Sequence, residues 1–167
     1  MWDGRDKTLG AMTLKEKSCC FTGHRQLPPG EEAVLANKLA VQIGTLAGYG
    51  VEQFYCGGAL GFDTLAATSV LKARKLFPKL KLILLLPCRT QAKYYNKYQK
   101  QLYQHILSNA DGVTYISDAY TAWCMYERNR SLVDQSAYCI CYLRRRSGGT
   151  NYTVQYAKRR GLEIIYL

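Results

Sequence analysis

A glycine-rich stretch in the first half of the chain has the residue types of a phosphate-binding loop. Residues 55–63 read Tyr-Cys-Gly-Gly-Ala-Leu-Gly-Phe-Asp and lie between a short β-type run at 51–54 and a segment with helical spacing at 64–73. A glycine-rich link from strand to helix lets the backbone pass close to a ligand and directs the first free N–H groups of the helix at an anion. A tight turn alone would explain the same glycines, because a single loop of this kind is a weak signal.

A second link of the same kind, Ser147-Gly148-Gly149-Thr150, precedes the last helical segment. A phosphate bound there would meet backbone N–H groups, the Thr150 hydroxyl and the positive end of the helix dipole. The run Arg144–Arg146 comes directly before this link, and in so short a segment we expect only one of its arginines to reach a ligand. The predicted phosphate-binding residues are Gly57, Gly58, Gly61, Ser147, Gly148, Gly149 and Thr150.

Two other segments carry polar residues that could join such a site. Thr22-Gly23-His24-Arg25 follows the first β-type run, and His24 and Arg25 would add a pair of hydrogen-bond donors. Asp63 stands near a helix start, where it either caps the helix and favours its dipole or accepts hydrogen bonds from ribose hydroxyls. Both interpretations of Asp63 remain open.

The helical segment 122–135 carries a polar pair beside an apolar stripe. The inward face is defined by Met125, Leu132, Val133 and Ser136. Asn129 lies on this face and Arg128 borders it one step round the helix. Such a pair is either satisfied by the core or turned towards a ligand, and its place near a helix start favours the ligand.

Two common nucleotide-binding signatures are incomplete or absent. Read as G-x-G-x-x-G, the first loop has Cys56 where the first glycine belongs, and no acidic residue follows about 20 positions later to hold an adenosine ribose. The P-loop pattern G-x-x-x-x-G-K-[ST] does not occur. The sequence therefore argues against an NAD dehydrogenase and a P-loop ATPase, and we expect no cofactor.

The net charge of the chain points to an anionic partner. With 167 residues, 48% of them hydrophobic and 21% charged, the composition is that of one ordinary globular domain. A formal charge of +11 suits either a nucleic acid or a small phosphorylated ligand over a basic mouth. The segment 91–110 is rich in tyrosine and lysine, which could stack on bases, although core packing and a solvated face explain it as well.

The seven cysteines form no recognisable metal or disulfide pattern. No C-x-x-C pair occurs, so we expect neither a zinc site nor a disulfide framework. Most of the thiols lie in or beside apolar runs and are expected to be buried and reduced. Cys56 and Cys88 stand at strand ends, where a chemical role is a minor alternative.

The ends and the hydropathy of the chain bear on its location. No apolar run reaches the roughly 18 residues of a membrane span, and the N-terminus has no segment resembling a secretory signal. We therefore expect a cytoplasmic protein that does not bind membranes. Residues 1–13 show no periodicity and are expected to be disordered or foreign to the natural protein, whose start could be Met12. A single domain is expected over 14–167.

Helical and β-type segments alternate along the rest of the chain. The expected strands cover 18–21, 51–54, 80–86, 112–116, 137–143 and 162–166. The first expected helix carries apolar residues from 35 to 46 and ends at Gly48 and Gly50, and the others cover 64–73, 91–110, 122–135 and 152–160. This alternation predicts an α/β sandwich with a mostly parallel sheet. Ligands of such sheets bind at the carboxyl ends of the strands, where the strand order reverses. The loops that carry the polar and glycine-rich motifs are expected to meet there.

With these residues in view, the chain resembles the SLOG superfamily, which includes SMF/DprA and LOG proteins, and most of all its YpsA-like branch. The resemblance covers roughly Ser18 to the end. It rests on Thr-Gly-His-Arg at 22–25, Gly-Gly-Ala-Leu-Gly-Phe-Asp at 57–63, Arg128-Asn129, and Ser-Gly-Gly-Thr at 147–150. The resemblance implies a Rossmann-like three-layer fold that binds nucleotides or nucleotide-derived molecules, including relatives of NAD and ADP-ribose. It also implies pairing into homodimers.

One departure from the LOG enzymes bears on catalysis. Those enzymes are phosphoribohydrolases of nucleoside monophosphates, with an Arg-Lys pair followed by P-G-G-x-G-T-x-x-E. Here Arg128 matches the arginine, Asn129 replaces the lysine, and Thr153 stands where the glutamate that helps N-glycosidic cleavage belongs. The resemblance therefore favours a binding protein over a hydrolase.

Three hypotheses about function follow. The first is a sensor or sequestering protein for an NAD- or ADP-ribose-type ligand, with Arg25 and Arg128 neutralising charge and Asn129 and Asp63 contacting ribose or base. The second is a nucleotide N-glycosidase with Asp63 as its carboxylate. The third, by analogy with the DprA branch and from the positive charge, is single-stranded DNA binding.

Overall fold

The structure, a computed structural model, describes residues 11–167, with strands and helices alternating along the chain. The six strands are β1 (Ser18–Gly23), β2 (Gln53–Cys56), β3 (Lys81–Cys88), β4 (Gly112–Ser117), β5 (Tyr138–Tyr142) and β6 (Glu163–Tyr166). The five helices are α1 (Glu31–Gly48), α2 (Phe62–Ala73), α3 (Lys97–Asn109), α4 (Cys124–Asp134) and α5 (Gly148–Arg159). The expectation that residues 1–13 are disordered falls mostly on residues 1–10, which lie outside the described residues.

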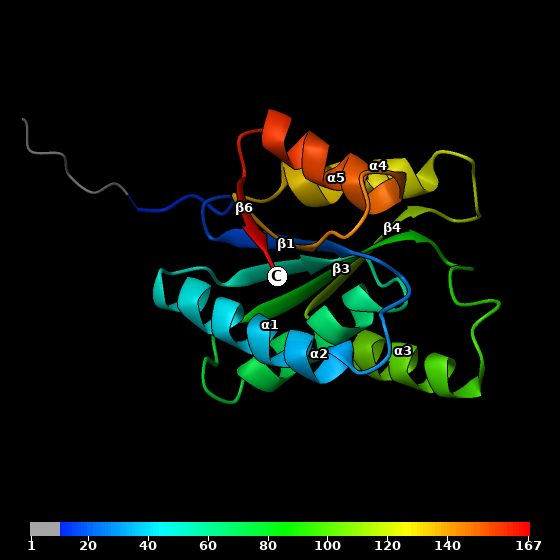
Figure 1. The fold of residues 1–167 in the computed structure, drawn as a ribbon, viewed down its shortest axis with the longest axis horizontal. Coiled ribbons are helices and arrows are strands. Elements are labelled where there is room, and N and C mark those ends of the chain that lie inside the picture. The colour runs from blue at the N-terminus through cyan, green and yellow to red at the C-terminus, as the bar shows by residue number, and fades with distance from the viewer. Residues whose placement is uncertain (1–10) are drawn as a thin grey trace, which may run out of the picture.

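The strands form one sheet in the order β4-β3-β2-β1-β5-β6, and every neighbouring pair is parallel. Helices α1, α2 and α3 cover one face, and α4 and α5 cover the other (Figure 1). The α/β three-layer prediction is thus confirmed, with a sheet that is wholly parallel. The strand order runs from β1 to β4 in one direction and resumes with β5 on the other side of β1, so it reverses between β1 and β5.

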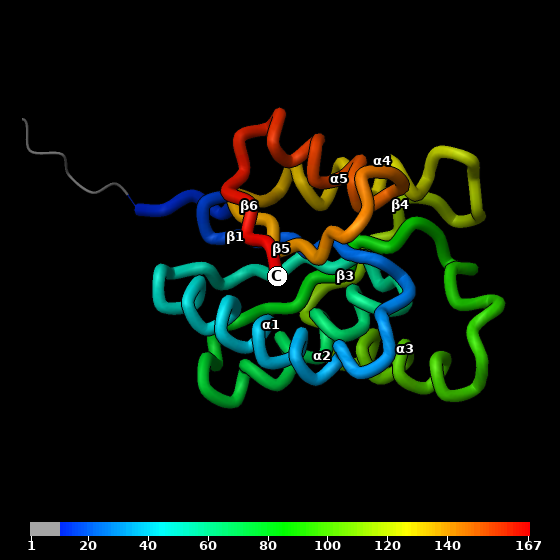
Figure 2. The backbone as a smooth tube through the Cα atoms, in the orientation of Figure 1, coloured from blue at the N-terminus to red at the C-terminus, as the bar shows by residue number. Residues whose placement is uncertain are grey.

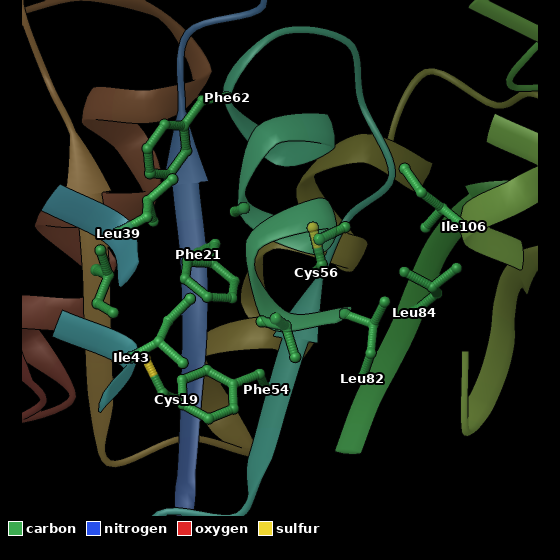
Figure 3. Packing of buried hydrophobic residues seen from close by; sticks show 14 of the residues in the cluster. Cys19, Phe21, Leu39, Ile43, Phe54, Cys56, Phe62, Leu82, Leu84 and Ile106 are labelled. Atoms are coloured by element: carbon green, nitrogen blue, oxygen red, sulfur yellow. The ribbon is translucent and has the colours of Figure 1, made fainter. Parts of the chain in front are cut away.

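Central strand β1 is buried on both faces, as expected for the apolar run Cys19–Phe21 in a parallel sheet. Alternate residues point to opposite faces, so Phe21 joins the core under α1 and α2, where its ring lies 5.8 Å from that of Phe54 (Figure 3). Cys20 points the other way, into a smaller core that includes Leu132 of α4 and Val154 of α5. These two cores hold the helices against the two faces of the sheet.

All five helices begin at residues other than the predicted ones, and the starts of α3 and α5 have a clear physical reason. Helix α3 starts at Lys97 instead of residue 91, because Asn96 caps it in a reciprocal capping box with Gln99, each bond 2.9 Å long. The preceding residues 89–95 form turns. Helix α5 starts at Gly148 instead of residue 152, so the second glycine link supplies the first turn of the helix itself.

The thiols lie inside the protein, as their apolar sequence surroundings predicted. All seven cysteines are buried and free. Among residues 11–167, no helix combines the length and apolar character needed to cross a membrane.

Candidate ligand-binding site

A cavity of about 530 Å³ opens at the carboxyl ends of β1 and β5, where the strand order reverses. In Figure 2 the chain leaving β1 and the chain leaving β5 both run to this same end of the sheet. The predicted residues that line the cavity are Thr22, Gly23, His24, Arg25, Asp63, Arg128, Asn129, Ser147, Gly148, Gly149 and Thr150. The structure thus brings together four segments that are far apart in the sequence.

Three predicted phosphate-binding residues, Gly57, Gly58 and Gly61, do not line this cavity. Packing inside the protein explains why they are glycines. Gly61 has a φ of 74°, and a Cβ there would overlap the Arg25 carbonyl oxygen. Gly58 has a φ of 69°, and its Cβ would overlap Leu86. The first glycine loop is therefore shaped by its neighbours in the fold, and this packing does not depend on a phosphate.

The loop after β1 is joined to the first glycine loop by backbone contacts. The Phe62 N–H donates to the His24 carbonyl over 3.1 Å. A Cβ on Gly23 would overlap the Phe62 ring, so the ring can lie against the strand end only where glycine stands. The start of α2 and the end of β1 consequently form one rigid floor for the cavity.

Arg128 reaches from α4 onto Gly57, and a Cβ on that glycine would overlap the guanidinium. Its Nη1 donates to the Gly57 carbonyl, and its Nε donates to the Asn129 Oδ1 over 2.8 Å. The Asp63 Oδ2 lies 4.0 Å from the same Nη1. Arg128 is only 5% exposed, so its charge is held by two hydrogen bonds and one nearby carboxylate.

The helical face predicted for α4 needs one correction. Its buried residues are Cys124, Arg128, Leu132 and Val133. The first three recur every four residues, so Arg128 lies within the buried stripe and Asn129 is the half-buried neighbour that faces the cavity. The sequence did contain a signal for the buried position of Arg128. If Cys124 is counted in the apolar pattern, the stripe runs through Arg128 and no longer through Asn129.

Asp63 is the one carboxylate among the lining residues and is 6% exposed. Its Oδ2 accepts from the Ala59 N–H over 3.2 Å, so the carboxylate holds the preceding loop. Burial raises the pKa of Asp63, and Arg128, the Ala59 N–H and Arg25 oppose the rise. The cavity therefore contains a carboxyl group that takes up a proton more readily than an exposed aspartate does.

The adjacent Cys56 is bound to this same turn and is unsuited to nucleophilic chemistry. Its Sγ donates to the Asp63 carbonyl over 3.2 Å. Burial, followed by the charge of Asp63, raises the pKa of Cys56 far above its ordinary value. The group remains a neutral thiol, which is a poor nucleophile.

The start of α5 presents open backbone to the cavity. Ser147 is the N-cap residue, and its side chain makes no capping hydrogen bond. A Cβ on Gly148 would meet nothing within 4 Å, and one on Gly149 would meet only the Asn129 Nδ2 at 4.0 Å. The free N–H groups and the positive end of the helix dipole are therefore available to an anion.

Of the three consecutive arginines before α5, Arg145 lines the cavity. Arg144 is turned away, with its guanidinium carbon 4.4 Å from the centre of the Tyr142 ring and its Nη1 donating to the Leu167 carbonyl over 3.3 Å. Together with Arg25 and Arg128, Arg145 gives the lining three arginines against the single carboxylate of Asp63. This excess of positive charge suits an anionic ligand.

His24 joins the two sides of the cavity instead of offering both ring nitrogens to a ligand. Its Nε2 accepts from the Arg144 N–H over 2.9 Å, and its ring meets that of Tyr142 edge-on at 5.8 Å. Burial lowers the pKa of His24, and the charges of Arg145 and Arg144 lower it further. The imidazole is therefore neutral at pH 7 and holds the loop after β5 to the loop after β1.

Several lining residues were not among the predicted ones, notably Gln26, Tyr120, Met125 and Tyr126. Tyr126 is held on the rim by the ring of Tyr152, whose centroid lies 5.0 Å away at an interplanar angle of 83°. The sequence carried a weak signal for two of them, because Tyr120 follows a strand and Tyr126 lies next to the polar pair on α4. Aromatic rings at the rim give the cavity surfaces on which a planar group could stack.

A family model described as YpsA, YspA SLOG family, matches residues 29–166. The chain belongs to this family. Curated relatives include the uncharacterized SPbeta prophage-derived protein YoqJ of Bacillus subtilis (strain 168), 27% identical over 119 residues that cover 64% of this chain and 70% of YoqJ. A UPF0398 protein of Bacillus cereus is 28% identical over 136 residues, covering 80% of this chain and 73% of the relative. The predicted membership of the YpsA-like branch is thus confirmed.

Two solved structures of DNA processing protein A share the fold. The protein from Helicobacter pylori, described in terms of its single-stranded DNA binding mode, matches with a TM-score of 0.62 at 20% identity, over 89% of this chain and 64% of that one. The protein from Streptococcus pneumoniae matches with a TM-score of 0.64 at 17% identity, over 92% and 50%. This YpsA-family chain therefore spans between half and two thirds of each DprA chain, and at these identities the likeness concerns the fold.

Proposed function

We propose that this YpsA-family protein binds a nucleotide-derived ligand of the NAD or ADP-ribose type and acts as a sensor or sequestering protein. The observation that carries the proposal is the uncapped first turn of α5, which faces a cavity lined by three arginines. A phosphate at Gly148 and Gly149 would accept from the free N–H groups and lie within the field of Arg145.

The nucleoside part of such a ligand would lie towards α4 and the first glycine loop. The Asn129 amide borders the start of α5, and the Asp63 carboxyl lines the same cavity beside Arg128. Amide and carboxyl groups are suited to ribose hydroxyls and base edges, and the rim ring of Tyr126 is suited to stacking. These groups support a nucleotide in preference to inorganic phosphate alone.

Substitutions at Gly149 test the proposal by calorimetric titration with AMP, ADP-ribose and NAD. The wild type is expected to bind at least one of them. Gly149→Asp should abolish binding because the new carboxylate repels phosphate, yet leave the fold intact because an acidic residue in the first turn of a helix favours its dipole. Gly149→Asn, of the same size without the charge, is the matched control and should retain more affinity. Absence of binding by the wild type, or equal binding by the Asp and Asn variants, would contradict the proposal.

A nucleotide N-glycosidase is a second candidate, favoured by the raised pKa of Asp63 in the cavity wall. A carboxyl group with a raised pKa can donate a proton to a leaving base. Thr153, which replaces the LOG glutamate, does not support this candidate. It is fully buried, and its Oγ1 donates to the Gly149 carbonyl over 2.8 Å. Free base released from a nucleotide by the wild type, and not by Asp63→Asn, would favour the enzyme.

Single-stranded DNA binding is a third candidate, favoured by large aromatic side chains that are exposed on the surface. They include Tyr94, Tyr98, Tyr120 and Trp123. The Lys93 Nζ lies 5.3 Å from the ring centre of Tyr94, which places a cation beside an exposed ring, a combination found on surfaces that stack bases. Affinity for an oligodeoxynucleotide that falls steeply between low and physiological salt would favour this candidate, and undetectable binding at low salt would remove it.

A further inference from the structure

A second cavity of about 500 Å³ lies beside the first, and nothing in the proposed function uses it. Its walls come from the first glycine loop, the end of β3 and the turns before α3. Arg25, Tyr120 and Met125 line both cavities, so the two adjoin along a shared boundary. The inference drawn from this continuity rests on the proposed function.

The second cavity has the surfaces of a pocket for a planar ring. Leu60, Pro87, Tyr94 and Tyr95 supply aliphatic and aromatic faces, and no carboxylate is among its lining residues. The Tyr95 hydroxyl donates to the Gly58 carbonyl over 3.4 Å, which fixes this ring. The Gln91 Nε2 donates to the Gly57 carbonyl over 3.2 Å. The first glycine loop thus holds one wall of the second cavity in place.

Arg25 lines both cavities, and its guanidinium is not engaged by another described side chain. Among residues 11–167, its side chain forms no hydrogen bond or ion pair. Burial raises the pKa of both Asp63, in the first cavity, and Tyr95, in the second, and the charge of Arg25 opposes the rise in each case. A guanidinium close to both cavities is placed to neutralise phosphates that pass from one to the other.

We propose that the two cavities together hold one pyrophosphate-linked dinucleotide. One nucleoside and a phosphate occupy the first cavity at the start of α5, Arg25 binds the linking phosphate, and the second ring lies against Tyr94 in the second cavity. The protein is therefore expected to discriminate between ligands that carry one base and ligands that carry two.

The test is calorimetric titration with three ligands. AMP has one base, ADP-ribose adds the pyrophosphate and a second ribose, and NAD adds the second base, nicotinamide. We expect NAD to bind about tenfold or more tightly than AMP, since stacking of one ring has an effect of this order. Tyr94→Ala should remove most of this preference and leave the affinity for AMP unchanged. Tyr98→Ala is the matched control, because Tyr98 is also exposed, at 72%, and lines neither cavity.

A second variant fills the pocket instead of removing its wall. Thr90 is an exposed lining residue of the second cavity and not of the first, so Thr90→Trp should obstruct the second ring and spare AMP. Equal affinity of the wild type for AMP and NAD, or equal weakening of both ligands by Tyr94→Ala, would overturn the proposal and leave the first cavity's function standing. Failure of every nucleotide to bind would instead overturn the proposed function itself.

Titration with a short oligodeoxynucleotide tests whether the two cavities bind a free dinucleotide or two adjacent nucleotides of a nucleic acid. It presents two rings across a single phosphate, whereas NAD presents them across a pyrophosphate. We expect it to bind less tightly than NAD and to be indifferent to Tyr94→Ala. Tighter binding than NAD, lost in Tyr94→Ala, would overturn the assignment to a free dinucleotide.

Discussion

The two glycine-rich segments look alike in sequence and differ in what surrounds them. In the first, an added methyl group at Gly57, Gly58 or Gly61 would overlap Arg128, Leu86 or the backbone of Arg25. In the second, a Cβ on Gly148 meets nothing within 4 Å, and one on Gly149 meets only an amide nitrogen at 4.0 Å. The glycines of the first segment are packed against other parts of the protein, whereas those of the second face the open cavity.

This difference separates two reasons for having glycine. The first segment needs glycine so that the loop after β1, the helix α2 and the side chain of Arg128 can approach one another. No such contact demands glycine at Gly149, which leaves its N–H and the adjacent space free for a ligand. Substitutions in the first segment should therefore change stability, and those at Gly149, which has no positive φ, should change binding.

Gly61→Ala is expected to have the largest effect on stability. The left-handed backbone at φ 74° is unfavourable for alanine, and the new Cβ would overlap the Arg25 carbonyl oxygen, which cannot move without displacing the loop after β1. Strain and overpacking together should lower the free energy of unfolding by about 2–5 kcal/mol, measured by urea denaturation.

A control separates the two causes of that loss. Gly30 also has a left-handed φ, 82°, but a Cβ there would meet nothing within 4 Å. Gly30→Ala should therefore cost only the backbone term, about 1–2 kcal/mol. If Gly61→Ala is no more destabilising than Gly30→Ala, the first segment is not closed in the way described.

A smaller, pH-dependent effect on the free energy of unfolding is expected from His24. Its Nε2 accepts from the Arg144 N–H and joins the loop after β1 to the loop before the second glycine segment. Because burial and the neighbouring arginines lower the pKa of His24 in the folded protein, the unfolded chain binds this proton more readily. The contribution of His24 is therefore fully present above the unfolded pKa of about 6.5 and is lost as the pH falls through the folded value. His24→Gln retains an acceptor that does not titrate.

The measurement is the free energy of unfolding of both proteins between pH 7.5 and pH 5. Wild type should lose more stability over this range than His24→Gln. Other titrating groups, including Asp63, are common to both proteins and largely cancel in the difference. Parallel pH profiles would show that His24 is not held in its neutral form by the fold.

Gly149→Ala is expected to have the smallest effect on stability, and one of opposite sign. The residue lies in the first turn of α5 with no positive φ, so alanine should leave the free energy of unfolding unchanged or raise it by up to about 1 kcal/mol. Ligand affinity should fall nonetheless, because the methyl group enters the cavity beside the free N–H groups. A destabilised variant with undiminished affinity would reverse the assignment of the two segments.

Local patterns predicted most of the fold and the end of the sheet at which the cavity opens. Strands and helices follow from short-range periodicity, and the meeting of the loops follows from the parallel arrangement of the strands. The role of Gly57 did not follow, because its partner Arg128 is 71 residues away along the chain. The start of α3 was misplaced because tyrosine and lysine do not mark a boundary, whereas the Asn96–Gln99 capping box does.

The reversal of strand order also sets when the site can exist during synthesis. The side formed by β1, α2 and the first glycine loop leaves the ribosome early, but α4, β5 and the start of α5 emerge only with the last third of the chain. Since β5 must insert beside β1 to complete the crevice, a nascent chain lacking it has the floor and no opposite wall. The cavity is thus a feature that the polypeptide acquires only after β5 has been synthesised and has paired with β1.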